Sequence, residues 1–374
     1  MSVNIDTTTA TVLGIRQKDQ LNLRSIMAVL LQKKKHDTGI NWRPLFLYLF
    51  MTVFGCIGGP FLMRLYFMHG GKRKWLSSWL QNVGFPFFLG PLLFLYFKQQ
   101  TESTPASFFM DSKLFASSAG LGVIVGLDSY FYSVGLFYIP VSTSGILTST
   151  QLSFTALFAF LIVKQKLTFY SINSVILMTL GAIVLAFHSS GDRPPGVSNS
   201  EYFLGFFFTL AGAVLLGLSF PLVELAYSKS SKPITLAVVL QFQFIASLSA
   251  TIFCTIGMVI NNDFDVIPRE AKEYAIGEVK YYIVLVTSAI AWQFLFTGML
   301  GVVYYTSSLF FGIFSSGLLP FVQIGAVIAF HDKFTSEKGL SLGLCLWSFV
   351  SYFIGEYRSA QKKLTIVQEE EEIV

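Results

Sequence analysis

Charged residues and cysteines are scarce in this sequence of 374 residues. Charged residues make up 13% of the chain, about half of the usual share in soluble proteins. Together with the apolar composition, this scarcity excludes a disordered chain, a coiled coil and a pair of soluble domains. The three cysteines, Cys56, Cys254 and Cys345, each lie in an apolar run, so we do not expect a disulfide framework.

The motifs of soluble catalysis are also missing. The four histidines, His36, His69, His188 and His331, lack the spacing of a metal site. The sequence contains no Walker loop for ATP and no Ser or Cys nucleophile motif. The first stretch of about 30 residues also lacks the apolar region of a signal peptide. We therefore expect neither an enzyme nor an ATP-driven pump, and neither a metal nor a cofactor.

Apolar residues dominate the sequence instead. They make up 53% of the chain, with 39 Phe, 16 Tyr and 5 Trp, which suits a protein solvated by lipid. A transmembrane helix needs about 20 apolar residues, and ten stretches qualify. They lie at about 44–67, 76–97, 114–137, 141–163, 168–188, 202–227, 233–260, 281–299, 302–330 and 339–357. The pattern predicts an all-α polytopic membrane protein with ten transmembrane helices.

Turn residues and charges divide these stretches. The predicted parts are a mostly disordered cytosolic tail (1–42), a first five-helix repeat (43–188), a linker loop (189–200), a second five-helix repeat (201–358) and an acidic cytosolic tail (359–374). The divisions at 137–141 and 299–302 depend on Pro140 and on Gly298 with Gly301. The side that carries the termini holds thirteen basic residues and the other side holds nine. The positive-inside rule then places both termini in the cytosol. We expect the plasma membrane, with an endomembrane as the alternative.

A weak internal duplication relates the two halves. When residues 138–168 are aligned with 305–335, nine of 31 positions are identical, among them Gly145 with Gly312 and Leu152 with Leu319. The two segments belong to the fourth and ninth predicted spans, an odd number of crossings apart, so the halves run in opposite directions. Inverted repeats of this kind are typical of secondary transporters, with the substrate site near the midplane of the bilayer.

The segment GGPFLMRLYFMHGGKRKWLSSWLQNVGFP, from Gly58 to Pro86, resembles the signature of plant purine permeases in the drug/metabolite transporter superfamily. The segments YIPVSTSGILTSTQLSFTALFAFLIVKQKLT and TSSLFFGIFSSGLLP are also similar, and the resemblance runs from about 44 to 357. It implies a five-plus-five inverted repeat and proton-coupled movement of purine bases, cytokinins, alkaloids or related heterocycles. One departure is Gln165, where the superfamily commonly has an acidic residue.

Few charged residues lie within the predicted spans: Arg64, Asp128, Glu224 and Glu356. A charge at a helix centre costs about 2.5–3.5 kcal/mol on insertion scales, so each is a candidate for a role. For Arg64 and Glu356 we favour structural or interfacial roles. Asp128 and Glu224 are the candidates for proton coupling. We favour Glu224, because a helix break at Pro221 would free backbone groups beside it; Asp128 is the alternative, or bonds the substrate.

A flat heterocycle needs aromatic faces for stacking and amide or hydroxyl groups for its edges. The spans supply such side chains at helical spacing, although polar stripes also bond neighbouring helices or their own backbone. The predicted substrate-binding residues are Trp79, Gln81, Asn82, Asp128, Tyr132, Thr148, Gln151, Gln241, Trp292, Gln293 and Tyr305.

Two other functions remain as alternatives at this point. An exchanger of sugar phosphates or nucleotide sugars would need several cationic side chains within the membrane, and the spans supply only Arg64. A multispan receptor that transports nothing would have no need of an inverted duplication. The net charge of +5 is small and spread out, which does not indicate a nucleic-acid partner. We therefore expect a proton-coupled importer of purines, cytokinins or related heterocycles.

Overall fold

The computed structural model describes residues 42–101, 109–164, 169–187, 193–194, 196–232, 234–305, 314, 318–331 and 333–373. Within these ranges every regular element is a helix, which confirms the predicted all-helical class. The helices are α2 (Trp42–Met68), α3 (Lys74–Asn82), η2 (Phe85–Phe88), α4 (Leu89–Thr101), α5 (Ser112–Tyr138), α6 (Val141–Ser149), α7 (Gln151–Phe158), η3 (Ala159–Val163), α8 (Phe169–Phe187), α9 (Asn199–Ser228), α10 (Leu236–Ile260), α11 (Asp263–Glu273), α12 (Glu278–Tyr305), α14 (Leu319–Phe330) and α15 (Ser336–Ile373). The predicted tail at 1–42 lies almost entirely outside the described residues.

Eight helical segments of the described chain are long and apolar enough to cross a membrane. The apolar part of α8, Phe169–Val184, is shorter, and the predicted span 302–330 falls partly outside the described residues. Large apolar side chains point outward along these segments, for example Phe50, Phe94 and Val286, which are 65%, 69% and 59% exposed. Because such side chains would be unfavourable in water, the chain is an integral, multi-pass membrane protein.

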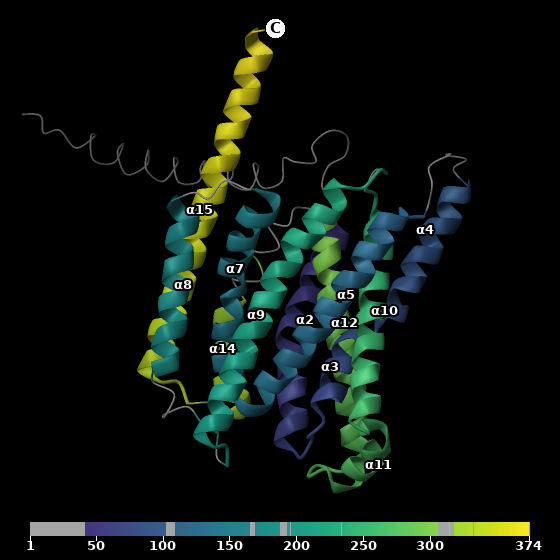
Figure 1. Ribbon diagram of the computed structural model, residues 1–374, viewed down its shortest axis with the longest axis vertical. Coiled ribbons are helices and arrows are strands. Elements are labelled where there is room, and N and C mark those ends of the chain that lie inside the picture. Colours follow the sequence, from purple (N-terminus) through teal and green to yellow (C-terminus); the bar gives the residue numbers. More distant parts are fainter. Residues whose placement is uncertain are drawn as a thin grey trace, which may run out of the picture.

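Helices from the two halves of the chain pack against one another (Figure 1). Helix α2 packs on α12, α5 packs on α9 and α10, and α8 packs on α15. The α8–α15 pair lies at one edge of the molecule, α11 lies at one end, and α15 extends beyond the other end (Figure 1). The predicted acidic tail at 359–374 is therefore, as far as Ile373, a continuation of the α15 helix.

The turn predicted at 299–302 is wrong, because α12 continues through both glycines to Tyr305. A Cβ atom on Gly298 would lie 2.5 Å from the Thr52 hydroxyl oxygen, and one on Gly301 would lie 2.1 Å from the Tyr48 ring. The glycines thus let α2 approach α12 closely, which is a common use of glycine between membrane helices. The turn predicted at Pro140 is confirmed, since α5 ends and α6 begins on either side of it.

The structure also corrects the helix break predicted at Pro221. Helix α9 is continuous through Pro221, as α2 is through Pro60. The charged segment 261–280, which separates the predicted spans 233–260 and 281–299, contains the amphipathic helix α11. Arg64 has the expected structural role: its Nη1 donates to the Leu136 carbonyl at 2.8 Å, near the C-terminal end of α5. A cation at that end of a helix is favoured by the helix dipole.

Candidate functional site

Two of the membrane-crossing segments are interrupted. The segment Lys74–Gln99 leaves the α-helix between Asn82 and the start of η2. The segment Val141–Val163 has a smaller break in its α-helical pattern, a tightened turn at Thr150 where the N–H donates to the Leu147 carbonyl at 3.1 Å. Tightened turns of this kind inside a helix often mark functional positions. Asn82 is the last residue of the first broken helix, and Gln151 begins the helix after the second break. Two predicted site residues therefore lie at the breaks.

The first break lies against α5. Gln81 Nε2 donates to the Ser129 carbonyl and to the Ser133 hydroxyl, both at 3.1 Å. Asn82 Nδ2 donates to the Ser129 hydroxyl at 2.9 Å. Both amide side chains are almost fully buried. The predicted residues Gln81 and Asn82 are thus fixed by hydrogen bonds to one short stretch of α5.

The same stretch of α5 meets α12 and α9 on its other sides. Tyr132 packs edge-on against Trp292, with ring centroids 5.9 Å apart. Asp128 faces α9, where a Cβ atom on Gly212 would lie 3.1 Å from its Oδ1. Among the described residues no hydrogen bond or ion pair holds the Asp128 carboxylate, and its side chain is partly buried. Residues 128–133 of α5 therefore bring together predicted residues from three helices.

Gln151 also contacts α9, but on a face about 140° away from the one that meets Asp128, because five residues turn a helix by about 500°. A Cβ atom on Gly217 would lie 2.9 Å from the Gln151 carbonyl oxygen, and Gly217 follows Gly212 by five positions on α9. Five residues of a helix span about 7.5 Å. Asp128 and Gln151 therefore contact neighbouring turns of one helix.

Several predicted site residues keep buried polar atoms that find no hydrogen-bond partner among the described residues. These atoms are Asn82 Oδ1, Thr148 Oγ1, Gln151 Oε1, Trp292 Nε1 and both amide atoms of Gln293. Buried polar atoms in proteins are nearly always hydrogen-bonded, and leaving one unpaired costs about 1–3 kcal/mol. These atoms on α3, α6, α7 and α12 are candidates for contact with a polar ligand.

The other predicted residues lie elsewhere. Trp79 Nε1 donates to the Thr255 hydroxyl on α10 at 3.0 Å. Gln241 Oε1 accepts from the Met110 backbone N–H at 3.0 Å, just before α5 begins. Glu224 is exposed, one turn before the end of α9, and so does not have the deep position expected of it. The Tyr305 side chain lies outside the described residues.

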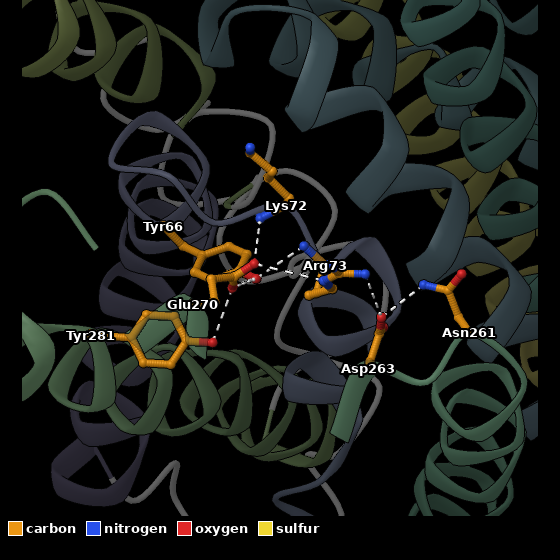
Figure 2. Close-up of polar contacts among 7 residues, drawn as sticks. All are labelled: Tyr66, Lys72, Arg73, Asn261, Asp263, Glu270 and Tyr281. Carbon is orange, nitrogen blue, oxygen red and sulfur yellow. Dashed lines mark hydrogen bonds and ion pairs between the residues drawn. The ribbon is translucent and has the colours of Figure 1, made fainter. Parts of the chain in front are cut away.

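The end of the molecule that carries α11 is held together by a polar cluster, which we call the α11 network (Figure 2). Its members are Tyr66, Lys72, Arg73, Asn261, Asp263, Glu270 and Tyr281. Glu270 Oε1 accepts from the hydroxyls of Tyr66 and Tyr281 at 2.5 and 3.0 Å, and Oε2 accepts from the Lys72 backbone N–H at 3.0 Å. The network thus joins the loop after α2 to α11 and α12.

Arg73 supplies the positive charge of the α11 network. Its guanidinium lies 3.5 Å from Asp263 Oδ1 and 3.8 Å from Glu270 Oε2. Burial raises the pKa of the Asp263 carboxyl, and hydrogen bonds from Asn261 and Arg73 oppose that rise. Sequence reasoning missed this network, although the basic loop at 72–74 and the acidic residues at 263–273 have opposite charges.

Comparison with known proteins identifies the family. Residues 44–362 match the profile of a family described as purine nucleobase transmembrane transport. The chain is 45% identical over 320 residues to purine permease 3 of Arabidopsis thaliana, covering 84% of this chain and 91% of that protein. It is 44% identical over 329 residues to purine permease 2 of the same plant, with coverages of 84% and 92%. The resemblance seen in the sequence is confirmed, and the chain belongs to the purine permease family.

Proposed function

We propose that this protein is a proton-coupled secondary transporter that imports purine bases, cytokinins or related heterocycles, alkaloids included, by alternating access. Membership of a purine nucleobase transport family supports the substrate class. The internal duplication supports ten crossings in a five-plus-five inverted repeat, and so does the packing of helices from the first half of the chain against helices from the second. The charge bias supports cytosolic termini, and we propose the plasma membrane as the site of import.

One observation supports the proposed substrate site: several buried amide and indole atoms of the predicted residues have no hydrogen-bond partner among the described residues. A purine base is flat and has donors and acceptors around its edge, and Asn or Gln amides can donate and accept at the same time. The amides of Asn82, Gln151 and Gln293 supply these groups, and the rings of Tyr132 and Trp292 supply apolar surface. A charged sugar phosphate would need several cations within the membrane, and the predicted spans supply only Arg64.

Of the two carboxylates considered for proton coupling, we propose Asp128. It lies within α5, next in sequence to the serine that holds Asn82, and no ion pair fixes its charge among the described residues. Glu224 is exposed and close to the end of α9. A carboxyl group that loads and releases a proton near the substrate can link the two movements, whereas one at the helix end cannot contact the substrate.

Uptake into proteoliposomes tests the proposed function. Radiolabelled adenine and trans-zeatin are offered with and without an inward proton gradient. We expect accumulation above the equilibrium level only with the gradient, and no accumulation in protein-free liposomes. Equilibration without gradient-driven accumulation would contradict proton coupling, and no uptake of either compound would contradict the proposed substrate class.

Alanine substitutions test the substrate site. We expect Asn82→Ala and Gln151→Ala each to weaken adenine binding by about 1–3 kcal/mol, since each removes a buried polar contact. This corresponds to about a 5- to 150-fold rise in Kd, measured by equilibrium binding to purified protein. Ser117→Ala, which alters an exposed hydroxyl on α5, is the matched control. Unchanged affinity in both variants, with normal folding, would rule out this site.

A further inference from the structure

An apolar groove of about 400 Å³ lies between α3, α10, α11 and α12. Trp79 and Leu80 form one wall, and Leu285 and Ala289 form the opposite wall. No charged side chain belongs to its lining within the described part of the chain. Neither Asp128 nor Gln151 is among its lining residues.

The groove opens toward the lipid. Its rim includes Phe87, Tyr282 and Val286, which are 57%, 42% and 59% exposed. Each of these residues belongs to a segment that is long and apolar enough to cross the membrane. The α11 residues Phe264 and Ile267 line it at the end where α11 lies. A molecule dissolved in the bilayer would therefore meet the opening from the side.

Gln293 lies in the lining of this groove and is 1% exposed. Its Nε2 and Oε1 atoms both lack a hydrogen-bond partner among the described residues. Gly84 is packed against the same amide, because a Cβ atom on Gly84 would lie 2.8 Å from Gln293 Cδ. An unpaired amide in apolar surroundings needs a partner that offers a donor and an acceptor side by side.

We propose that the groove is a lateral binding site, through which a neutral heterocycle with an apolar substituent reaches Gln293 from the bilayer. The donor–acceptor edge of the heterocycle pairs with the Gln293 amide, and the substituent lies between the α3 and α12 walls. The absence of charge from the described lining selects against ionised ligands. A phospholipid does not meet the same requirement, since its ester groups accept hydrogen bonds but do not donate them. This inference rests on the proposed function, because it assumes that purine-like compounds bind the protein.

Binding of N6-alkyl adenines to the full-length protein in lipid nanodiscs tests the groove. The series runs from adenine through N6-methyl to N6-hexyl adenine. In the unmodified protein we expect Kd to fall with each added methylene, by at most about fourfold per step. In Ala289→Trp, which fills the groove, the dependence of Kd on chain length should disappear. In Gln293→Leu the whole series should weaken by a similar factor, about tenfold.

The matched control is Ile283→Trp, which adds the same ring to α12 at a position that is 54% exposed and outside the groove lining. Ile283→Trp should leave the Kd of every member of the N6-alkyl adenine series unchanged. Ala289→Leu is a milder second variant, in case Ala289→Trp folds poorly, and should reduce the chain-length dependence. If both Ala289 variants keep the full dependence while adenine still binds, the lateral site is wrong and the proposed function stands. If no member of the series binds any variant or the unmodified protein, the proposed function itself fails.

Discussion

Replacing Glu270 by alanine is expected to lower the free energy of unfolding by about 3–5 kcal/mol, because three hydrogen-bond donors lose their acceptor at about 1–3 kcal/mol each. Glu270 is 7% exposed and accepts hydrogen bonds from two tyrosine hydroxyls and one backbone N–H. Without the carboxylate, these donors lose their acceptor and the Arg73 guanidinium keeps only Asp263 as a close ion-pair partner. A thermal or chemical unfolding curve of the purified protein in detergent measures the effect.

Glu273→Ala is the control for this prediction. Glu273 is the last residue of α11 and is exposed, so its substitution removes the same charge from the same helix without disturbing the α11 network. We expect a change of less than about 0.5 kcal/mol, as is usual for exposed positions. Equal stability of the Glu270→Ala and Glu273→Ala proteins would show that the network contributes little to holding this end together.

Replacing Asp128 by asparagine is expected to abolish proton-driven accumulation while substrate exchange continues. The amide resembles the protonated carboxyl in shape but cannot release a proton. One proton that moves through 100 mV supplies about 2.3 kcal/mol, enough for an accumulation ratio of about 50-fold. In proteoliposomes with such a potential, we expect the ratio to fall to about one in Asp128→Asn, with counterflow of labelled adenine retained.

Glu224→Gln provides the comparison for Asp128→Asn. Because Glu224 is exposed near the end of α9, this variant should accumulate substrate as the unmodified protein does. Loss of accumulation in Glu224→Gln alone would show that Glu224 carries the coupled proton, as the sequence first suggested. Full accumulation by both variants would show that neither carboxylate carries the coupled proton.

Much of the helical architecture could be predicted from composition and from hydrophobic run length, because both are local properties. The structural role of the glycines could not be predicted from the sequence. Gly298 and Gly301 fit a turn as well as a close helix contact, and only the position of Thr52 and Tyr48 on α2 decides between the two. Helix α11 had a readable signal in Phe264, Ile267 and Ala271, whose spacing is helical, but the surrounding charges favoured a loop.

The candidate site could be predicted by residue type more than by arrangement. Amide and aromatic side chains of the correct kinds were identified, and Asn82 and Gln293 do keep buried unpaired atoms. Which of them face one another depends on helix rotation, which the sequence does not specify. Gln241 illustrates the limit: as an amide in an apolar span it fitted a substrate contact, yet it bonds the backbone just before α5.

The pairing of α2 with α12 has a consequence for biogenesis. One close approach joins Gly55 to Leu295, where an added Cβ atom would lie 2.5 Å from the partner backbone, and these residues are 240 positions apart. At synthesis rates of about 5–20 residues per second, α2 leaves the ribosome about 10–50 s before its partner does. During that interval the glycine surface of α2 must be covered by lipid, by the insertion machinery or by temporary neighbours. Substitutions in α12 should therefore act first on the lifetime of the newly inserted chain.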